Sequence, residues 1–152
     1  MALPERKRPT TGVVVSSDGP TIVFVTVCTK DRRRWLATPQ VHALLRTLWA
    51  DSRAWRVGRY VLMPDHLHLF CAPGVSDISL ARWVKYWKAQ VTHHHRVADH
   101  QWQAGCWDTR LRTGESYERK WDYVRNNPVR QQLVGGAKDW PYQGELAVLP
   151  WY

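Results

Sequence analysis

The chain has 152 residues and a formal net charge of +9, which suits one domain that attracts a polyanion. Ten Trp and six Tyr accompany the cations and favour single-stranded nucleic acid as the partner, although the charge could also serve solubility alone. Three scattered Cys argue against a disulfide framework or a zinc knuckle. With no apolar run of membrane-spanning length and no signal-peptide core, we expect a soluble, cytoplasmic protein without membrane contact.

Strands and helices alternate along the predicted chain. Residues 1–20, rich in Pro, Gly, Ser and Thr with a basic cluster, are expected to form a flexible arm, and residues 21–152 a single domain. Strands are predicted at 21–29, 59–63 and 66–72, with a fourth within 101–113. Helices are predicted at 39–55, at about 76–97, from 115 or 116 to before Pro128, and at 129–134.

The connections refine this pattern. Gly58 is expected to separate the first helix from the second strand, and Ser76-Asp77 to cap the second helix. The tail from Asp139 onward is expected to pack back on the domain. Antiparallel strands alternating with helices predict an α+β fold, a sheet with helices packed on it, and a ferredoxin-like arrangement fits the order.

Two histidines share one predicted strand. His66 and His68 are two residues apart, so both side chains project from the same face, and Asp65 adds a carboxylate next to them. Two imidazoles on one face can offer two metal ligands, but an isolated His-x-His is more often a pair of ordinary half-buried residues. A metal would also need a third ligand from elsewhere in the chain.

The predicted helix before Pro128 could supply that ligand. Tyr117, Trp121 and Val124 form its core side, whereas Tyr123 and Asn127 share a different side with Lys120.

These groups suit phosphodiester cleavage. Tyr123 could attack a phosphate and hold it covalently, Lys120 could steady the phosphate or the phenolate, and Asn127 could complete a Mg²⁺ or Mn²⁺ site through its carbonyl oxygen. The ordinary alternative is a packed Tyr123 and an Asn127-Pro128 pair that only ends the helix.

Four segments together resemble a known family. Tyr-Val-Leu-Met-Pro-Asp-His-Leu-His-Leu-Phe (60–70) resembles the HUH signature of single-tyrosine transposases. Trp-Asp-Tyr-Val-Arg-Asn-Asn-Pro-Val-Arg (121–130), followed by Leu133-Val134, resembles the tyrosine helix of their REP-associated branch. Residues 24–32 and 107–112 are similar to the same branch, and the resemblance spans about residues 21–143.

The resemblance implies a site and a reaction. His66, His68 and Asn127 would be the metal ligands and Tyr123 the nucleophile, with Asn127 standing where the insertion-sequence branch carries Gln. The reaction would leave a 5′-phosphotyrosine and a free 3′-hydroxyl and then transfer the strand. The substrate would be single-stranded DNA hairpins of the repetitive extragenic palindrome (REP) kind, bound by a monomer or a homodimer on a ferredoxin-like HUH fold.

Several other residues are expected to contribute less directly. Backbone phosphate contacts are predicted for five arginines: Arg32, Arg33, Arg34, Arg110 and Arg112. The run His93-His94-His95 could bind metal or phosphate, but it lies on the polar stretch of a predicted helix and is expected to face solvent.

Three alternatives stay open. A non-catalytic nucleic-acid-binding domain on the same scaffold would bind without nicking, with salt-sensitive affinity. A nuclease that uses activated water would still cut after loss of Tyr123. A structural protein with core histidines would show no effect of metal on its stability.

Overall fold

The computed structural model describes residues 21–75 and 77–150, and within them five strands form one sheet. The strands are β1 (Ile22–Cys28), β2 (Trp55–Leu62), β3 (His66–Pro73), β4 (Trp107–Leu111) and β5 (Gln143–Glu145). The helices are α1 (Pro39–Ala50), α2 (Leu80–His95), α3 (Gly114–Arg125) and α4 (Asn127–Arg130), with short 3-10 turns η1 (Lys30–Arg32) and η2 (Ala137–Asp139).

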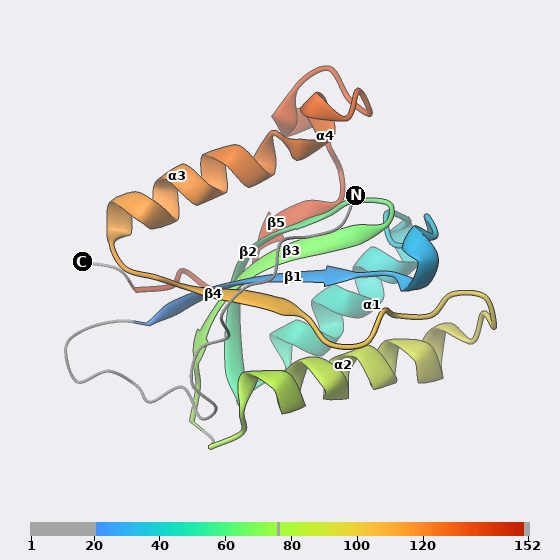
Figure 1. Ribbon diagram of the computed structural model, residues 1–152, viewed down its shortest axis with the longest axis horizontal. Coiled ribbons are helices and arrows are strands. Elements are labelled where there is room, and N and C mark those ends of the chain that lie inside the picture. The colour runs from blue at the N-terminus through green and yellow to red at the C-terminus, as the bar shows by residue number, and fades with distance from the viewer. Residues whose placement is uncertain (1–20, 76, 151–152) are drawn as a thin grey trace.

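The strand order is β4-β1-β3-β2-β5, and every pairing is antiparallel. The chain order βαββαβ with β1 and β3 in the middle is the ferredoxin-like arrangement, which confirms the predicted fold class. Figure 1 shows α1 and α2 on one side of the sheet and α3 on the other, so the sheet is covered on both faces.

Strand alternation divides the core into two layers. The layer facing α1 and α2 takes the odd-numbered residues of β1 and β3: Val23, Val25, Val27, Leu67, Leu69 and Cys71. The layer under α3 takes the even-numbered apolar residues together with the helix side chains: Ile22, Phe24, Phe70, Ala72, Tyr117 and Val124. His66 and His68 are even-numbered and therefore lie on the α3 side.

The boundary between α1 and β2 differs from the prediction. The helix ends at Ala50, and β2 already begins at Trp55, whose Nε1 donates to the carbonyl of Ile78 at 2.9 Å. Gly58 lies inside β2, at a register shift between Val57 and Tyr60, and does not separate helix from strand. A glycine within a strand marks such bulges, and here the Leu149 side chain occupies the space where a Cβ would point.

Helix caps explain two further shifts. Helix α2 is capped by Ser79, whose hydroxyl accepts the Arg82 amide, and not by Asp77, while the other predicted cap, Ser76, lies outside the described residues. The short helix predicted at 129–134 is instead α4, residues 127–130, because Gln132 adopts a left-handed φ of 60° that ends the helical path.

The tail packs back on the sheet as predicted. The indole of Trp140 is buried and donates to the carbonyl of Leu62 at 2.9 Å, and Leu149 is buried under α3. Strand β5, which was not predicted, pairs three residues with β2. All three cysteines are buried and none of them forms a disulfide.

The expected basic arm, residues 1–20, lies outside the described residues. Where the helices are described, none combines the length and the apolar character needed to cross a membrane.

Candidate metal and tyrosine site

The two histidines begin β3 immediately after a tight turn. The Met63 amide donates to the His66 carbonyl at 2.8 Å, and the Thr29 amide donates to the Asp65 carbonyl at 3.0 Å, which fixes the turn against the end of β1. The two imidazole rings lie 4.8 Å apart between centroids, at 79° to one another. The predicted same-face placement of His66 and His68 is therefore present in the structure.

Each imidazole is oriented through its Nδ1 atom. His66 Nδ1 lies 2.7 Å from Asp65 Oδ1, and His68 Nδ1 lies 2.9 Å from Thr26 Oγ1. Phe24, on the neighbouring strand, stacks against His68 at 5.2 Å between centroids. A carboxylate bonded to Nδ1–H fixes the tautomer that presents the Nε2 lone pair, which is the usual support of a metal-binding histidine.

Asn127 brings its side chain to both Nε2 atoms. Helix α3 ends at Arg125 with Asn126 as its C-cap, and α4 begins with Asn127. The Asn127 Nδ2 atom lies 3.3 Å from His66 Nε2 and 3.4 Å from His68 Nε2. Oxygen and nitrogen of an amide exchange by a simple flip, so the same position can present the Asn127 carbonyl oxygen.

This donor set fits a divalent cation. Two imidazole nitrogens converge on the Asn127 amide, which after a flip would add an oxygen ligand, and water can supply the remaining ligands of Mg²⁺ or Mn²⁺. Across residues 21–75 and 77–150, no group of three or more His, Cys, Asp or Glu side chains could hold a metal without such an amide. His66, His68 and Asn127 are thus the residues that would bind the ion.

Arg32 and Asp65 form a charged support behind His66, and the ion pair between them was not predicted from the sequence. Arg32 Nε donates to Asp65 Oδ2 at 3.0 Å, so Asp65 joins Arg32 to His66. The hydrogen bond with His66, aided by the Arg32 guanidinium and opposed by burial, holds the pKa of the Asp65 carboxyl well below its usual range. Asp31 and Arg32 both adopt a left-handed φ, near 55°, a strained conformation that this contact helps to maintain.

Tyr123 faces away from the sheet. Because α3 buries Tyr117 and Val124, the Tyr123 side chain projects to solvent and is 63% exposed. The Arg130 guanidinium lies 3.8 Å from the centroid of the Tyr123 ring, a close cation–π contact. Among the described residues, the Tyr123 hydroxyl makes no hydrogen bond, so the phenol is accessible to a substrate.

Lys120 lies one turn before Tyr123, on the side that faces the histidines. Its Nζ atom is 4.9 Å from the centroid of the Phe24 ring, the same ring that stacks on His68. Phe24 thus contacts both an ammonium group and a candidate metal ligand.

The five predicted DNA-contacting arginines do not form one surface. Arg32 is bound to Asp65, whereas Arg33 and Arg34 are exposed beside it. Arg110 and Arg112 are exposed near the opposite end of β1, because Arg110 pairs with Val23 while His66 pairs with Cys28. Five residues of extended strand, about 17 Å, separate these two pairings.

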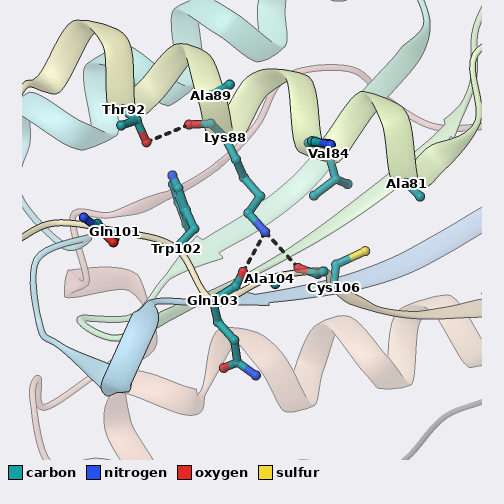
Figure 2. Close-up of a pocket in the computed structure, with 12 residues that line it drawn as sticks. Ala81, Val84, Lys88, Ala89, Thr92, Gln101, Trp102, Gln103, Ala104 and Cys106 are labelled. Atoms are coloured by element: carbon teal, nitrogen blue, oxygen red, sulfur yellow. Dashed lines mark hydrogen bonds between the residues drawn. The ribbon is translucent and has the colours of Figure 1, made fainter.

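A hollow of about 580 Å³ lies elsewhere, between α2 and residues 101–106 (Figure 2). The Lys88 side chain enters it, and its Nζ donates to the carbonyls of Gln103 at 2.8 Å and Gly105 at 2.9 Å. Burial lowers the pKa of Lys88. The α2 helix packs on the sheet face opposite the histidines, so this hollow is separate from the metal and tyrosine site.

Comparisons with known proteins agree with this geometry. No protein-family model matches the chain. The REP-associated tyrosine transposase of Escherichia coli K12 is 30% identical to it over 124 residues, 78% of this chain and 73% of the relative. A relative from Haemophilus influenzae is 29% identical over 137 residues, 80% of this chain and 77% of that protein.

A solved structure has the same fold. It is that of a REP-associated tyrosine transposase bound to a REP hairpin, with a TM-score of 0.71 and 25% sequence identity, covering 93% of this chain and 82% of the other. Identity at this level over most of both chains, together with the ferredoxin-like sheet, establishes the relationship. The chain belongs to the REP-associated tyrosine transposase family.

Proposed function

We propose that this transposase cleaves and rejoins single-stranded DNA at REP-like hairpins through a 5′-phosphotyrosine formed on Tyr123. The observation that carries the proposal is the convergence of both histidine Nε2 atoms on the Asn127 amide, which lies just after the helix that bears Tyr123. Two histidines that served only to pack in the core would not need to direct their Nε2 atoms at the same third side chain. The relative that was solved with a REP hairpin supports the choice of substrate.

Cleavage would transfer the phosphate directly from the DNA strand to Tyr123. The Tyr123 phenol releases its proton to water as its oxygen attacks the phosphorus, the bond from phosphorus to the 3′-oxygen breaks, and that oxygen takes up a proton from water to leave as a 3′-hydroxyl. The 5′-phosphate remains on Tyr123, so its bond energy is kept, and attack by another 3′-hydroxyl reverses the reaction and joins the strands. Lys120 stabilises the anionic charge near the phosphate.

Mg²⁺ or Mn²⁺ bound by His66, His68 and Asn127 would polarise the scissile phosphate. The protein's own part is to hold these three side chains in place. Asp65 and Thr26 fix the imidazoles through their Nδ1 atoms, and the break between α3 and α4 aims the Asn127 amide at them.

The test is a search for a covalent adduct with DNA. Wild type is incubated with Mg²⁺ or Mn²⁺ and labelled single-stranded hairpin oligonucleotides from its own genome, and the products are separated on a denaturing gel. We expect a metal-dependent protein–DNA band that disappears in Tyr123→Phe. Tyr86→Phe is the matched control, because Tyr86 on α2 is 62% exposed, close to the value for Tyr123.

Two other outcomes would favour the alternatives. Cutting that persists in Tyr123→Phe would indicate a nuclease that uses activated water. Tight hairpin binding with neither cutting nor adduct would indicate a non-catalytic DNA-binding domain.

A further inference from the structure

Two imidazoles outside the metal and tyrosine site form a flat pair. His95, at the end of α2, and His100, in the following loop, have Nε2 and Nδ1 atoms 2.8 Å apart. Their ring centroids are 5.0 Å apart and their planes differ by 19°. The centroid separation is close to the nitrogen–nitrogen distance plus two ring radii, so the rings meet edge to edge in nearly one plane.

This pair lies on an indole. Trp35, which is buried, is nearly parallel to both imidazoles, at 15° to His95 and 9° to His100, with centroids 5.6 Å and 5.2 Å away. Trp102 supports the indole from its edge, at 4.9 Å. We call these three residues, Trp35, His95 and His100, the aromatic platform: the two imidazoles form a flat plate that stacks on the indole.

One side of the platform opens to solvent. A hollow of about 630 Å³ is bounded by the three platform rings and by a polar rim that includes Arg34 and His94, both exposed. Burial, and then the neighbouring His100, lowers the pKa of His95. The two imidazoles share one hydrogen bond and present a flat surface, and Arg34 supplies a positive charge at the rim.

The platform lies at the same end of the sheet as the metal and tyrosine site. The amide of Leu36, next to Trp35, donates to the Pro64 carbonyl at 3.0 Å, immediately before Asp65. The loop after α2 joins the same end of the sheet, because the Lys30 amide donates to the Gln101 carbonyl at 2.9 Å. Figure 1 shows η1 and the end of α2 at this end of the molecule. The platform thus lies at the same end of the sheet as His66 but on the face that α1 and α2 cover, so a strand bound at His66 would have to pass around this end of the sheet to contact it.

From this geometry we infer that the platform binds an unpaired nucleotide of the DNA strand, with the base stacked on the His95–His100 plate and the phosphate near Arg34. Bases stack on flat rings whatever their sequence, and a guanidinium beside such a platform binds the backbone. The inference rests on the proposed function for its substrate. It adds a subsite that recognises single-stranded DNA beyond the position of cleavage.

The test measures stacking separately from cleavage. Hairpin oligonucleotides carry 2-aminopurine at successive unpaired positions, and binding is followed in EDTA, where a metal-dependent reaction cannot proceed. We expect the fluorescence to be quenched at one or more positions in wild type. In His100→Ala the quenching should disappear and the Kd should rise about tenfold, which corresponds to about 1.4 kcal/mol.

Two variants make the result specific. His100→Phe keeps a flat ring and should restore most of the quenching, which separates stacking from a general loss of folding. His93→Ala removes an exposed imidazole near the same helix end and should behave as wild type. Unchanged Kd and quenching in His100→Ala, or an equal loss in His93→Ala, would overturn the inference.

The Tyr123 adduct, assayed in parallel with metal, distinguishes the two proposals. Adduct formation without quenching at any position would overturn the platform and leave the proposed function in place. Quenching that depends on His100, without an adduct, would support the platform and contradict the proposed reaction.

Discussion

At the scale of single residues, the support behind the two histidines determines whether they can hold a metal. His66 and His68 have different partners, a carboxylate in one case and a hydroxyl in the other. Asp65 in turn forms an ion pair with Arg32. Arg32 is one of the five arginines predicted to bind phosphate, and in the structure its guanidinium is already engaged by this carboxylate. Arg32 would therefore support the proposed metal site through Asp65.

Replacing Asp65 by Asn tests this support. The substitution keeps the shape of the side chain but removes the negative charge that orients His66 and stabilises its Nδ1–H. We expect affinity for Mn²⁺ to fall about 10- to 100-fold, as for other partners of metal-binding histidines. Isothermal titration calorimetry on the DNA-free protein measures the affinity for Mn²⁺. The control is Asp51→Asn, because Asp51 lies exposed at the end of a helix. An unchanged Mn²⁺ affinity would show that Asp65 does not support the site.

The sequence predicted some of these residues and not others for a clear physical reason. A spacing of two on a strand is enough to place His66 and His68 side by side. Thr26 could not be found this way, because its contact with His68 depends on the register between β1 and β3. Asn127 was predicted to lie beside Tyr123 on one helix. In the structure the helix is interrupted at Asn126, and the side-chain amide of Asn127 points toward the histidines.

At the scale of elements, the attachment of α3 to the sheet controls where Tyr123 lies. Arg59 on β2 provides much of this attachment. Its guanidinium lies 5.0 Å from the Tyr117 ring centroid and 5.6 Å from that of Trp121, and it pairs with Glu118 of α3 at 3.1 Å. It also pairs with a carboxylate of β5, Glu145, at 3.4 Å, which connects the tail to the same helix.

Arg59→Ala should loosen α3 specifically. Removing two cation–π interactions and two ion pairs should cost about 1 kcal/mol, or about 2–4 °C in Tm for a chain of this size. Amide hydrogen exchange in α3 should become faster than in α1, and the Tyr123 adduct should form more slowly. Arg119→Ala breaks an exposed ion pair with Glu115 on the same helix and should change neither quantity. Equal acceleration of exchange in α1 would indicate general destabilisation.

Element boundaries were predicted less well than the elements themselves. The periodicity of apolar residues indicated β1, α1, β3 and α3 within a few residues, because burial imposes that pattern. The bulge at Gly58 and the strand β5 were missed because both depend on the packing of the tail against β2. Residues 143–145 have little β-forming character, so their sequence does not indicate a strand.

At the scale of the whole molecule, a net charge of +9 favours a polyanion, but the five arginines predicted to contact DNA are divided between the two ends of the sheet. Arg33 and Arg34 lie beside the support of His66, whereas Arg110 and Arg112 lie near the start of α3. Composition predicts the attraction and cannot predict this division, which follows from the strand register. DNA bound at the histidines should thus depend mainly on the first pair.

Arg33→Gln should make DNA binding less sensitive to salt. Removing one interaction with a phosphate of single-stranded DNA reduces the slope of log K against log salt by about 0.7. Fluorescence anisotropy from low to moderate salt measures the slope. The control is Arg53→Gln, because Arg53 is exposed just before β2, at the sheet end that lies away from His66, and should leave the slope unchanged. If both variants reduced the slope of log K against log salt equally, the contribution of an arginine to DNA binding would not depend on its position, and the prediction would be wrong.

The most direct measurement is mass spectrometry of the protein–DNA product after digestion with protease and nuclease. The expected result is a nucleotide joined through its 5′-phosphate to the peptide that contains Tyr123, formed only when Mg²⁺ or Mn²⁺ is present. A linkage to another tyrosine, or cleaved DNA with a free 5′-phosphate and no modified peptide, would contradict the assignment of Tyr123 as the nucleophile.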